Sequence, residues 1–252
     1  MHRAARLSVI LERLADGGSV AVADLADDLD ASAATIRRDL VILEEQRLLA
    51  RTHGGAIAHV VSYELPLRYK GVRHAEEKRR IARAAAEYVS EGMAVGLTGG
   101  TTATEVARAL ADRQKLTIVT NALNIASELA VRPGLKLIST GGVVRSQSYE
   151  LSGPIAEASL TGLNLNIAFV GVDGIDARAG CTTHREVEAH TNAVMIKCSR
   201  HVVVVADSSK IGKVAFARIC EVTAVSELIT DVAADADAVR ALTEAGVRVT
   251  LV

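Results

Sequence analysis

The residues with the clearest chemical potential lie in the run VGLTGGTTATEV, residues 95–106. Thr98, Gly99, Gly100, Thr101 and Thr102 separate an apolar stretch from a helical pattern. Glycines let a backbone approach an anion, the amides at a helix N-terminus point towards it, and threonine hydroxyls add donors. The run therefore predicts a phosphate-binding loop. The alternative is that the glycines only allow the chain to bend between a strand and a helix.

Polar residues also follow four other apolar stretches of the sequence. They are Asn121 after LTIVT, Gly142 and Arg145 after LKLIST, Asp173 after IAFVGV, and Lys210 after HVVVVA. If these stretches form a parallel sheet, their ends share one edge with the Gly/Thr loop. There, Lys210 and Arg145 would balance a phosphate, while Asn121 and the carboxylates would bind hydroxyls. Together they predict a phosphorylated sugar or polyol as ligand, although each also fits a cap, a turn or a solvent-exposed position.

A different chemistry is indicated near the N-terminus by the run TIRRDL. Ile36, Leu40 and Leu43 share one face of a helical pattern, which places Arg38 on the opposite face. Arginine can bind DNA phosphates or the acceptor edge of guanine. The run therefore predicts the recognition helix of a helix-turn-helix domain. A solvated helix that happens to carry two arginines is the alternative.

The neighbouring residues complete the predicted DNA-binding surface. Ser32 is a candidate N-cap, so the amides of the first helical turn could meet a phosphate. A Gly-Gly turn further on predicts a wing that contacts the DNA backbone or the minor groove. The predicted DNA contacts are Ser32, Thr35, Arg37, Arg38, Arg51 and His53.

Net charge does not support this prediction. Residues 1–60 contain seven Arg, no Lys and nine acidic residues, a net charge of −2. The acidic residues gather in the second helical pattern and at the end of the third, which leaves a narrow positive face. The prediction of DNA binding therefore depends on the organisation of the segment.

The elements that must position these residues suggest two domains. Three short helical patterns and a hairpin predict a winged helix-turn-helix over residues 1–58, and an aperiodic stretch interrupted by Pro66 and Gly71 predicts a linker over residues 59–75. Residues 76–252 alternate helices with seven short apolar stretches. That alternation predicts an α/β fold with a doubly wound, mostly parallel sheet.

Composition limits the other possibilities. The chain has 252 residues, a net charge of −1, and no apolar run long enough for a signal peptide or a membrane span. Three widely spaced cysteines without a CxxC pattern predict reduced thiols and no metal site. We therefore expect a soluble, cytoplasmic protein with no membrane contact and no cofactor apart from a small-molecule effector.

Both halves of the sequence resemble one family. The run from RLSVILERL to RTHGGA resembles the DNA-binding domain of DeoR-family bacterial transcription regulators, and the likeness covers roughly residues 3–57. The segments GLTGGTT, TNALNIA, TGGVVR, FVGVDGID, AGCTTHREVEA and VADSSKIG resemble that family's effector domain, which is similar to ribose-5-phosphate isomerase. The resemblance implies operator binding through residues 32–43 and effector contacts from the Gly/Thr loop, Asn121, Asp173 and Lys210. Thr98 replaces a usual Asp, and Asn192 replaces a frequent Lys.

These observations leave a regulator and an enzyme to be distinguished. Glu186 lies near the position expected for an isomerase's proton-shuttling carboxylate, but the lysine-containing glycine stretch of the isomerases is missing between residues 176 and 180. We therefore expect no catalytic residues. The prediction is a repressor of carbohydrate catabolism genes that acts as a homo-oligomer, a dimer or tetramer, and is relieved by a sugar phosphate. The alternative is an isomerase or related enzyme fused to a DNA-binding module.

Overall fold

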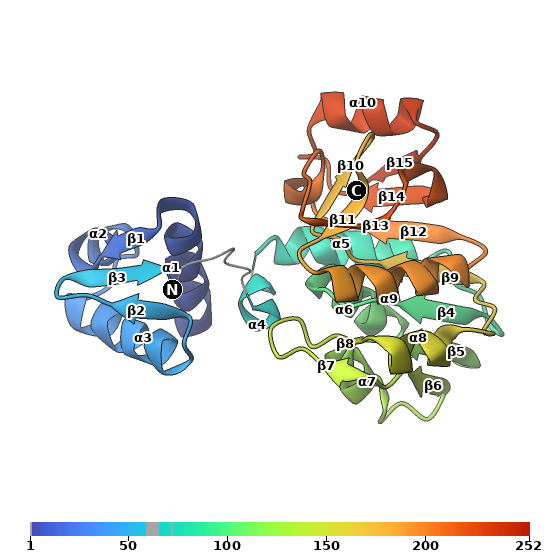
Figure 1. Cartoon of the computed structure of the whole chain (residues 1–252), viewed down its shortest axis with the longest axis horizontal. Helices are drawn as coiled ribbons and strands as arrows, with labels where there is room; N and C mark the ends of the chain where they lie inside the picture. The colour runs from blue at the N-terminus through green and yellow to red at the C-terminus, as the bar shows by residue number, and fades with distance from the viewer. Residues whose placement is uncertain (1, 59–65, 72) are drawn as a thin grey trace. The chain divides into compact units, whose positions relative to one another are not determined.

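The computed structural model describes residues 2–58, 66–71 and 73–252 (Figure 1). By contacts, the chain divides into a unit of Met1–Arg73 and a unit of His74–Val252, and each is described by itself. Of the segment predicted to be a linker, residues 59–65 and residue 72 lie outside the described residues.

The N-terminal unit is a winged helix-turn-helix, as predicted. Its apolar stripes form a single core that includes Leu7, Ile10 and Leu14 of the first helix and Ile36 and Leu40 of the third. A short strand before the second helix was not predicted, and it makes the wing a three-stranded antiparallel sheet of order β1-β3-β2. The elements are α1 (Arg3–Gly17), β1 (Ser19–Ala21), α2 (Val22–Asp28), α3 (Ala33–Glu45), β2 (Leu49–Arg51) and β3 (Gly55–Ala58).

The segment predicted to be a linker contains a one-turn helix, α4 (Leu67–Lys70). Tyr69 of α4 is buried in the core of the N-terminal unit. The Ser8 hydroxyl donates a hydrogen bond to the Tyr69 carbonyl at 2.7 Å, and the Tyr69 hydroxyl donates to Gln46 Oε1. The chain is therefore attached to the N-terminal unit as far as Lys70.

The second unit is built on a seven-stranded, entirely parallel sheet (Figure 1). Its strands are the seven apolar stretches of the sequence, so this prediction is confirmed. The strand order is β15-β14-β12-β9-β4-β5-β6. The bounds are β4 (Ala94–Leu97), β5 (Leu116–Thr120), β6 (Leu135–Ser139), β9 (Ile167–Val170), β12 (Val202–Val205), β14 (Glu227–Thr230) and β15 (Arg248–Leu251).

Helices cover both faces of this sheet because both faces of its central strands are apolar. Val203 and Val205 belong to a core shared with three helices, whereas Val202 and Val204 belong to a second core on the opposite face. The first face packs against α5 (Ala75–Ala86), α6 (Thr101–Leu110) and α7 (Leu123–Leu129). The second packs against α8 (Pro154–Leu160), α9 (Glu186–Lys197) and α10 (Ala236–Glu244).

Several short elements lie outside the seven-stranded sheet and were not predicted. One antiparallel pair joins β7 to β8, and a three-stranded antiparallel sheet has the order β10-β11-β13. The elements are β7 (Val143–Val144), β8 (Leu151–Ser152), β10 (Gly174–Asp176), β11 (Gly180–Thr183), β13 (Ala217–Cys220) and the 3-10 turns η1 (Ser208–Lys210) and η2 (Val222–Ala224).

The strand order reverses between β4 and β9. The chain adds β5 and β6 on one side of β4, then returns to place β9 on the other side. In open α/β sheets, ligands bind outside the carboxyl ends of the strands at such a switch point. The loops after β4 and β9 therefore mark the place to look for a ligand site. No helix in the described part of the chain is long and apolar enough to cross a membrane.

Candidate functional site

The loop after β4 is tied directly to β9 across the switch point. The Thr98 amide donates a hydrogen bond to the Phe169 carbonyl at 3.2 Å, and the Gly171 amide donates to Thr98 Oγ1 at 2.8 Å. The Thr98 side chain has no exposed surface. Its hydroxyl therefore holds the two loops together, and only the backbone of this residue remains to line a ligand site.

The two glycines that follow are required by close packing and by backbone conformation. A Cβ on Gly99 would lie 2.4 Å from Glu150 Oε1, and a Cβ on Gly171 would lie 2.4 Å from the Gly99 carbonyl oxygen. Gly100 has φ of +113° and is the N-cap of α6, which begins with Thr101 and Thr102. The amides of the first turn of α6 thus start at the switch point, an arrangement that suits an anion. However, the side chain that borders Gly99 is the carboxylic acid of Glu150, which would repel an anion when ionised.

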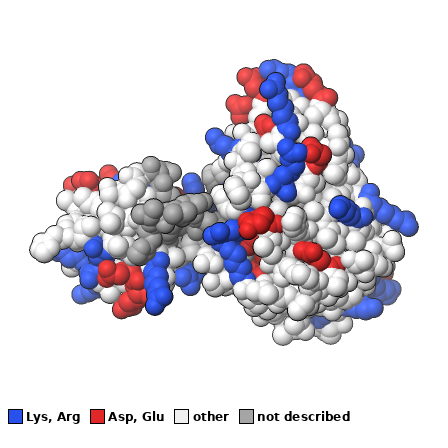
Figure 2. Space-filling view, in the orientation of Figure 1, with Lys and Arg blue, Asp and Glu red and all other residues white. Residues whose placement is uncertain are grey.

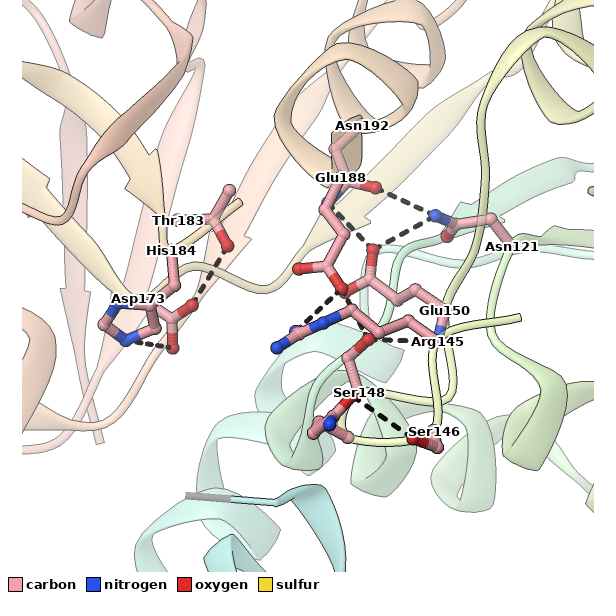
Figure 3. Close-up of polar contacts among 11 residues, drawn as sticks. Asn121, Arg145, Ser146, Ser148, Glu150, Asp173, Thr183, His184, Glu188 and Asn192 are labelled. Atoms are coloured by element: carbon pink, nitrogen blue, oxygen red, sulfur yellow. Dashed lines mark hydrogen bonds and ion pairs between the residues drawn. The ribbon is translucent and has the colours of Figure 1, made fainter. Parts of the chain in front are cut away.

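Glu150, which precedes β8, belongs to a buried polar cluster with Asn121 and Asn192 (Figure 3). Asn121, after β5, donates from Nδ2 to Glu150 Oε2 at 3.3 Å and to Asn192 Oδ1 at 3.0 Å. Asn192, on α9, donates from Nδ2 to the same Glu150 oxygen at 3.3 Å. The Asn121 side chain has no exposed surface, and its Oδ1 has no hydrogen-bond partner.

A second buried carboxylate, Glu188, lies beside this cluster on α9. Its Oε1 accepts a hydrogen bond from Arg145 Nη1 at 3.1 Å and from Ser148 Oγ at 2.5 Å (Figure 3). The loop that carries Arg145 begins at Gly142, where φ is +117° and a Cβ would lie 2.8 Å from the Ser152 carbonyl oxygen. Gly142 thus has a conformational role, whereas Arg145 brings a positive charge to the site.

Asp173 and Lys210 meet on the other side of the switch point. Asp173 Oδ1 lies 4.0 Å from Lys210 Nζ and 3.7 Å from His184 Nε2, and Asp173 Oδ2 accepts a hydrogen bond from Thr183 Oγ1 at 3.0 Å. Lys210 is in η1, directly after β12. The Asp207 side chain begins this turn by accepting a hydrogen bond from the Ser209 amide at 3.2 Å.

The charges of these carboxyl groups are set by their surroundings. Burial and the neighbouring charge of Glu188 raise the pKa of Glu150 to about 8. For Asp207, burial acts to raise the pKa, but the hydrogen bond from Ser209 and the charge of Lys78 lower it below its usual value. Glu150 is thus mainly protonated at pH 7, and Asp207 is ionised.

The structure places all the predicted effector residues at the carboxyl edge of the sheet. Three groups of contacts result: Asn121 with Glu150 and Asn192, Asp173 with Lys210, and Arg145 with Glu188. Sequence reasoning missed Glu150, Glu188 and Ser148. Glu186, considered for an enzymatic role, is exposed, and Glu188 occupies the site in its place. The signal for Glu188 was available, because Glu188 and Asn192 are four residues apart on one helix and share a face.

The predicted DNA-contacting residues lie on α3 and the wing. Ser32 caps α3, as predicted, by accepting a hydrogen bond from the Thr35 amide at 3.2 Å. Arg37, Arg38 and His53 are exposed, whereas Arg51 pairs with Glu44 of α3, at 2.7 Å between Nε and Oε2. Positive and negative side chains are interspersed on the visible face of this unit (Figure 2). This agrees with the charge count of the sequence.

The orientation of α3 is fixed from its buried side. Asp39, within TIRRDL, is buried and accepts hydrogen bonds from Arg6 of α1, one of them at 3.3 Å. Asp39 thus ties α3 to α1. The acidic residue of the run therefore positions the helix, and its two exposed arginines remain available to a partner.

The sequence was also compared with known proteins. Residues 6–60 match the family described as the DeoR-like helix-turn-helix domain, and residues 73–232 match the DeoR C terminal sensor domain. The chain is 33% identical over 244 residues to the glycerol-3-phosphate regulon repressor of Escherichia coli K12, covering 97% of each chain. It is 38% identical over 251 residues to the transcriptional regulator GlpR of Haloferax volcanii, covering 99% of this chain and 98% of the relative.

Among solved structures, ribose 5-phosphate isomerase A from Neisseria gonorrhoeae is similar to part of the chain. It has 20% sequence identity and a TM-score of 0.41, and the match covers 54% of this chain and 52% of the isomerase.

Proposed function

Because the chain belongs to the DeoR family of transcription regulators, we propose that it represses genes of carbohydrate catabolism and that a phosphorylated sugar relieves the repression. The two relatives described above are regulators that match nearly the whole length of this chain, and one of them is named for glycerol-3-phosphate. The DNA contacts come from α3 and the wing: Ser32, Thr35, Arg37, Arg38, Arg51 and His53.

One observation supports the effector proposal most directly: the glycine loop at the start of α6 lies at the switch point of the parallel sheet. The backbone of Gly99 and Gly100 and the first amides of α6 receive the phosphoryl group, and Lys210 provides a positive charge. The remaining contacts come from Thr98, through its backbone, and from Thr101, Thr102, Asn121, Gly142, Arg145 and Asp173.

Repression requires two DNA-binding units to reach two half-sites of an operator, so the protein acts as a homo-oligomer, a dimer or a tetramer. The effector favours an arrangement of the protein that no longer matches the half-sites. A coupling free energy of about 1–3 kcal/mol, which is typical of allosteric proteins, weakens operator binding by roughly 5–150-fold.

The sugar phosphate is bound and is not converted. Isomerisation requires a carboxylate that moves a proton and a group that stabilises the enediolate. Glu188 is a buried carboxylate near the switch point, but its Oε1 already accepts hydrogen bonds from Arg145 and Ser148. The lysine of the isomerase glycine stretch is also missing. Sustained turnover of a pentose or hexose phosphate that Glu188→Gln abolishes would contradict this proposal.

Paired substitutions test the assignment of the two units. Arg38→Ala should weaken binding of a labelled operator at least about tenfold, because it removes an exposed contact of α3, and should leave effector binding unchanged. Lys210→Ala should do the reverse. Operator binding is measured by fluorescence anisotropy, and effector binding by the rise in Tm with a panel of sugar phosphates.

The matched controls are Arg83→Ala and Lys213→Ala, which remove exposed basic side chains elsewhere in the second unit. Neither control should change either measurement. If the wild-type protein binds no operator in the presence or absence of any sugar phosphate, the proposed function is wrong. If both test substitutions leave their assigned activities intact, the family stands but the residue assignments are wrong.

A further inference from the structure

The carboxyl group of Glu150 is buried without a cation. Among the described residues, the polar partners of this carboxyl group are the side-chain amides of Asn121 and Asn192. The neighbouring positive charge, Arg145, is paired with Glu188. A buried carboxyl group is stable when its negative charge is paired with a positive one or when a proton neutralises it. The site therefore lacks one positive charge.

The same cluster also lacks hydrogen-bond donors. Both amides donate to Glu150 Oε2, so no described donor reaches Oε1, and the buried Oδ1 of Asn121 has no partner. Exchanging the oxygen and nitrogen of Asn121 would not repair this. It would turn an oxygen towards two acceptors, Glu150 Oε2 and Asn192 Oδ1, which now receive hydrogen bonds. The missing donors must come from a ligand or from water.

The position of Glu150 makes this deficit important for an anionic ligand. Its Oε1 packs against Gly99, the first glycine of the phosphate loop. A phosphoryl group at the loop and an ionised carboxylate at Glu150 would repel each other at short range in a buried environment. A positive group close to both would remove the repulsion.

We propose that the ligand of this site is a phosphorylated amino sugar whose protonated amino group binds Glu150 and Asn121. This inference rests on the proposed function and specifies the ligand class. An ammonium group has three N–H donors, no acceptor and a positive charge, so it meets the deficit in charge and the deficit in donors. A hydroxyl group supplies a donor but leaves the carboxyl group without a counter-charge.

Two further observations agree with this assignment. The raised pKa of Glu150 shows that, without ligand, a proton supplies the missing charge; an ammonium group would replace that proton. A metal ion is a weaker candidate, because no group of three or more His, Cys, Asp or Glu side chains in the described part of the chain is arranged to hold one.

The test uses matched probes that differ in one group. Glucosamine 6-phosphate is compared with glucose 6-phosphate, and galactosamine 6-phosphate with galactose 6-phosphate, by calorimetric titration of the full-length protein at pH 7. At least one amino probe should bind about tenfold or more tightly than its hydroxyl counterpart, as expected for a hydrogen bond to a charged group. Glu150→Gln should remove most of that preference, so that the amino probe and its hydroxyl counterpart bind with similar affinity. Glu244→Gln, which changes an exposed carboxyl group, should retain the preference.

The outcomes separate this inference from the proposed function. If sugar phosphates bind but no amino probe is preferred, or if Glu150→Gln keeps the preference, the amino group is wrong and the proposed function stands. If no probe of either kind binds, the inference is overturned. Operator binding in the presence of the same probes, measured separately, then decides whether the proposed function also fails. Variants are compared only if their circular dichroism spectra and cooperative thermal unfolding match those of the wild type, which shows that the second unit is folded.

Discussion

At the scale of single residues, the charge of the candidate site depends on a pair of glutamates that lie in different environments. Glu188 is held by Arg145 and Ser148, whereas Glu150 receives only amide donors. Two neighbouring buried carboxyl groups cannot both ionise without a large cost, so the less supported one keeps its proton. The site is therefore sensitive to pH at Glu150.

We expect the stability of the ligand-free protein to decrease as the pH rises from about 4.5 to about 8. The pKa of Glu150 is about 8 in the folded protein and near 4.5, its ordinary value, in the unfolded chain. Between these values the folded state holds an extra proton, so each pH unit lowers the free energy of unfolding by roughly 1 kcal/mol. Denaturant unfolding of ligand-free protein at pH 6 and pH 8 measures this.

The variant Glu150→Gln has no titratable group at this position, so its free energy of unfolding should lose most of the dependence on pH. The control Glu244→Gln should keep it. An unchanged pH dependence in Glu150→Gln would show that another group is responsible.

Thr98 acts as a structural bridge, so its removal should affect stability. In Thr98→Val the shape is kept, but the Gly171 amide loses its acceptor. We expect a loss of about 1–3 kcal/mol in the free energy of unfolding, because a buried donor is left unpaired. Thr98→Ser keeps the hydroxyl and should cost less. Equal stability of Thr98→Val and the wild type in urea unfolding would show that the bridge contributes nothing.

At the scale of elements, the wing depends on a close approach between strands. A Cβ on Gly55, the first residue of β3, would lie 1.9 Å from the Val20 carbonyl oxygen of β1. The adjacent Gly54 has open space around it, with no atom within 4 Å of an added Cβ. The two glycines of the run RTHGG thus have different roles, which the sequence does not reveal.

This difference gives a matched pair of substitutions. Gly55→Ala should displace β1 from β3, so it should lower the stability of the N-terminal unit and weaken operator binding. Gly54→Ala should be tolerated in both respects. Circular dichroism during thermal unfolding and operator titration measure the two effects. If Gly54→Ala were as damaging as Gly55→Ala, the close contact with Val20 would not be the cause.

The elements also show how far the sequence could predict the structure. The central strands of the parallel sheet were predictable because both of their faces are buried, which produces continuous apolar runs such as VVVV at β12. Strand β10 was not, because three residues, GID, carry no period. Asn121 could be expected at the rim since it ends a strand, but Glu150 lies in an irregular segment that only the tertiary fold brings to Gly99.

At the scale of the whole molecule, the two units have separate cores, and buried ion pairs strengthen each one. In the second unit, Lys78 of α5 and Asp207 are both buried, with Nζ and Oδ2 3.8 Å apart. This pair joins α5, the helix that opens the unit, to the turn that carries Lys210. The start of the unit is therefore linked to the rim of the candidate site.

Lys78→Met should leave the Asp207 carboxylate buried without this partner and destabilise the second unit by roughly 3–5 kcal/mol. Hydrogen exchange should accelerate for amides of residues 74–252 and stay unchanged for residues 2–58, because the cores are separate. The double variant Lys78→Met, Asp207→Asn removes both charges and should recover part of the loss. Faster exchange in both units would show that their stabilities are coupled.

The packing of Tyr69 has a consequence for the reach of the protein along DNA. Because α4 is fastened to the N-terminal unit and α5 opens the next one, four residues separate the two helices. Such a tether spans no more than about 18 Å when fully extended. In the homo-oligomer that we propose, each DNA-binding unit would therefore search a small volume, which would raise its effective concentration at a correctly spaced half-site and lower it sharply elsewhere.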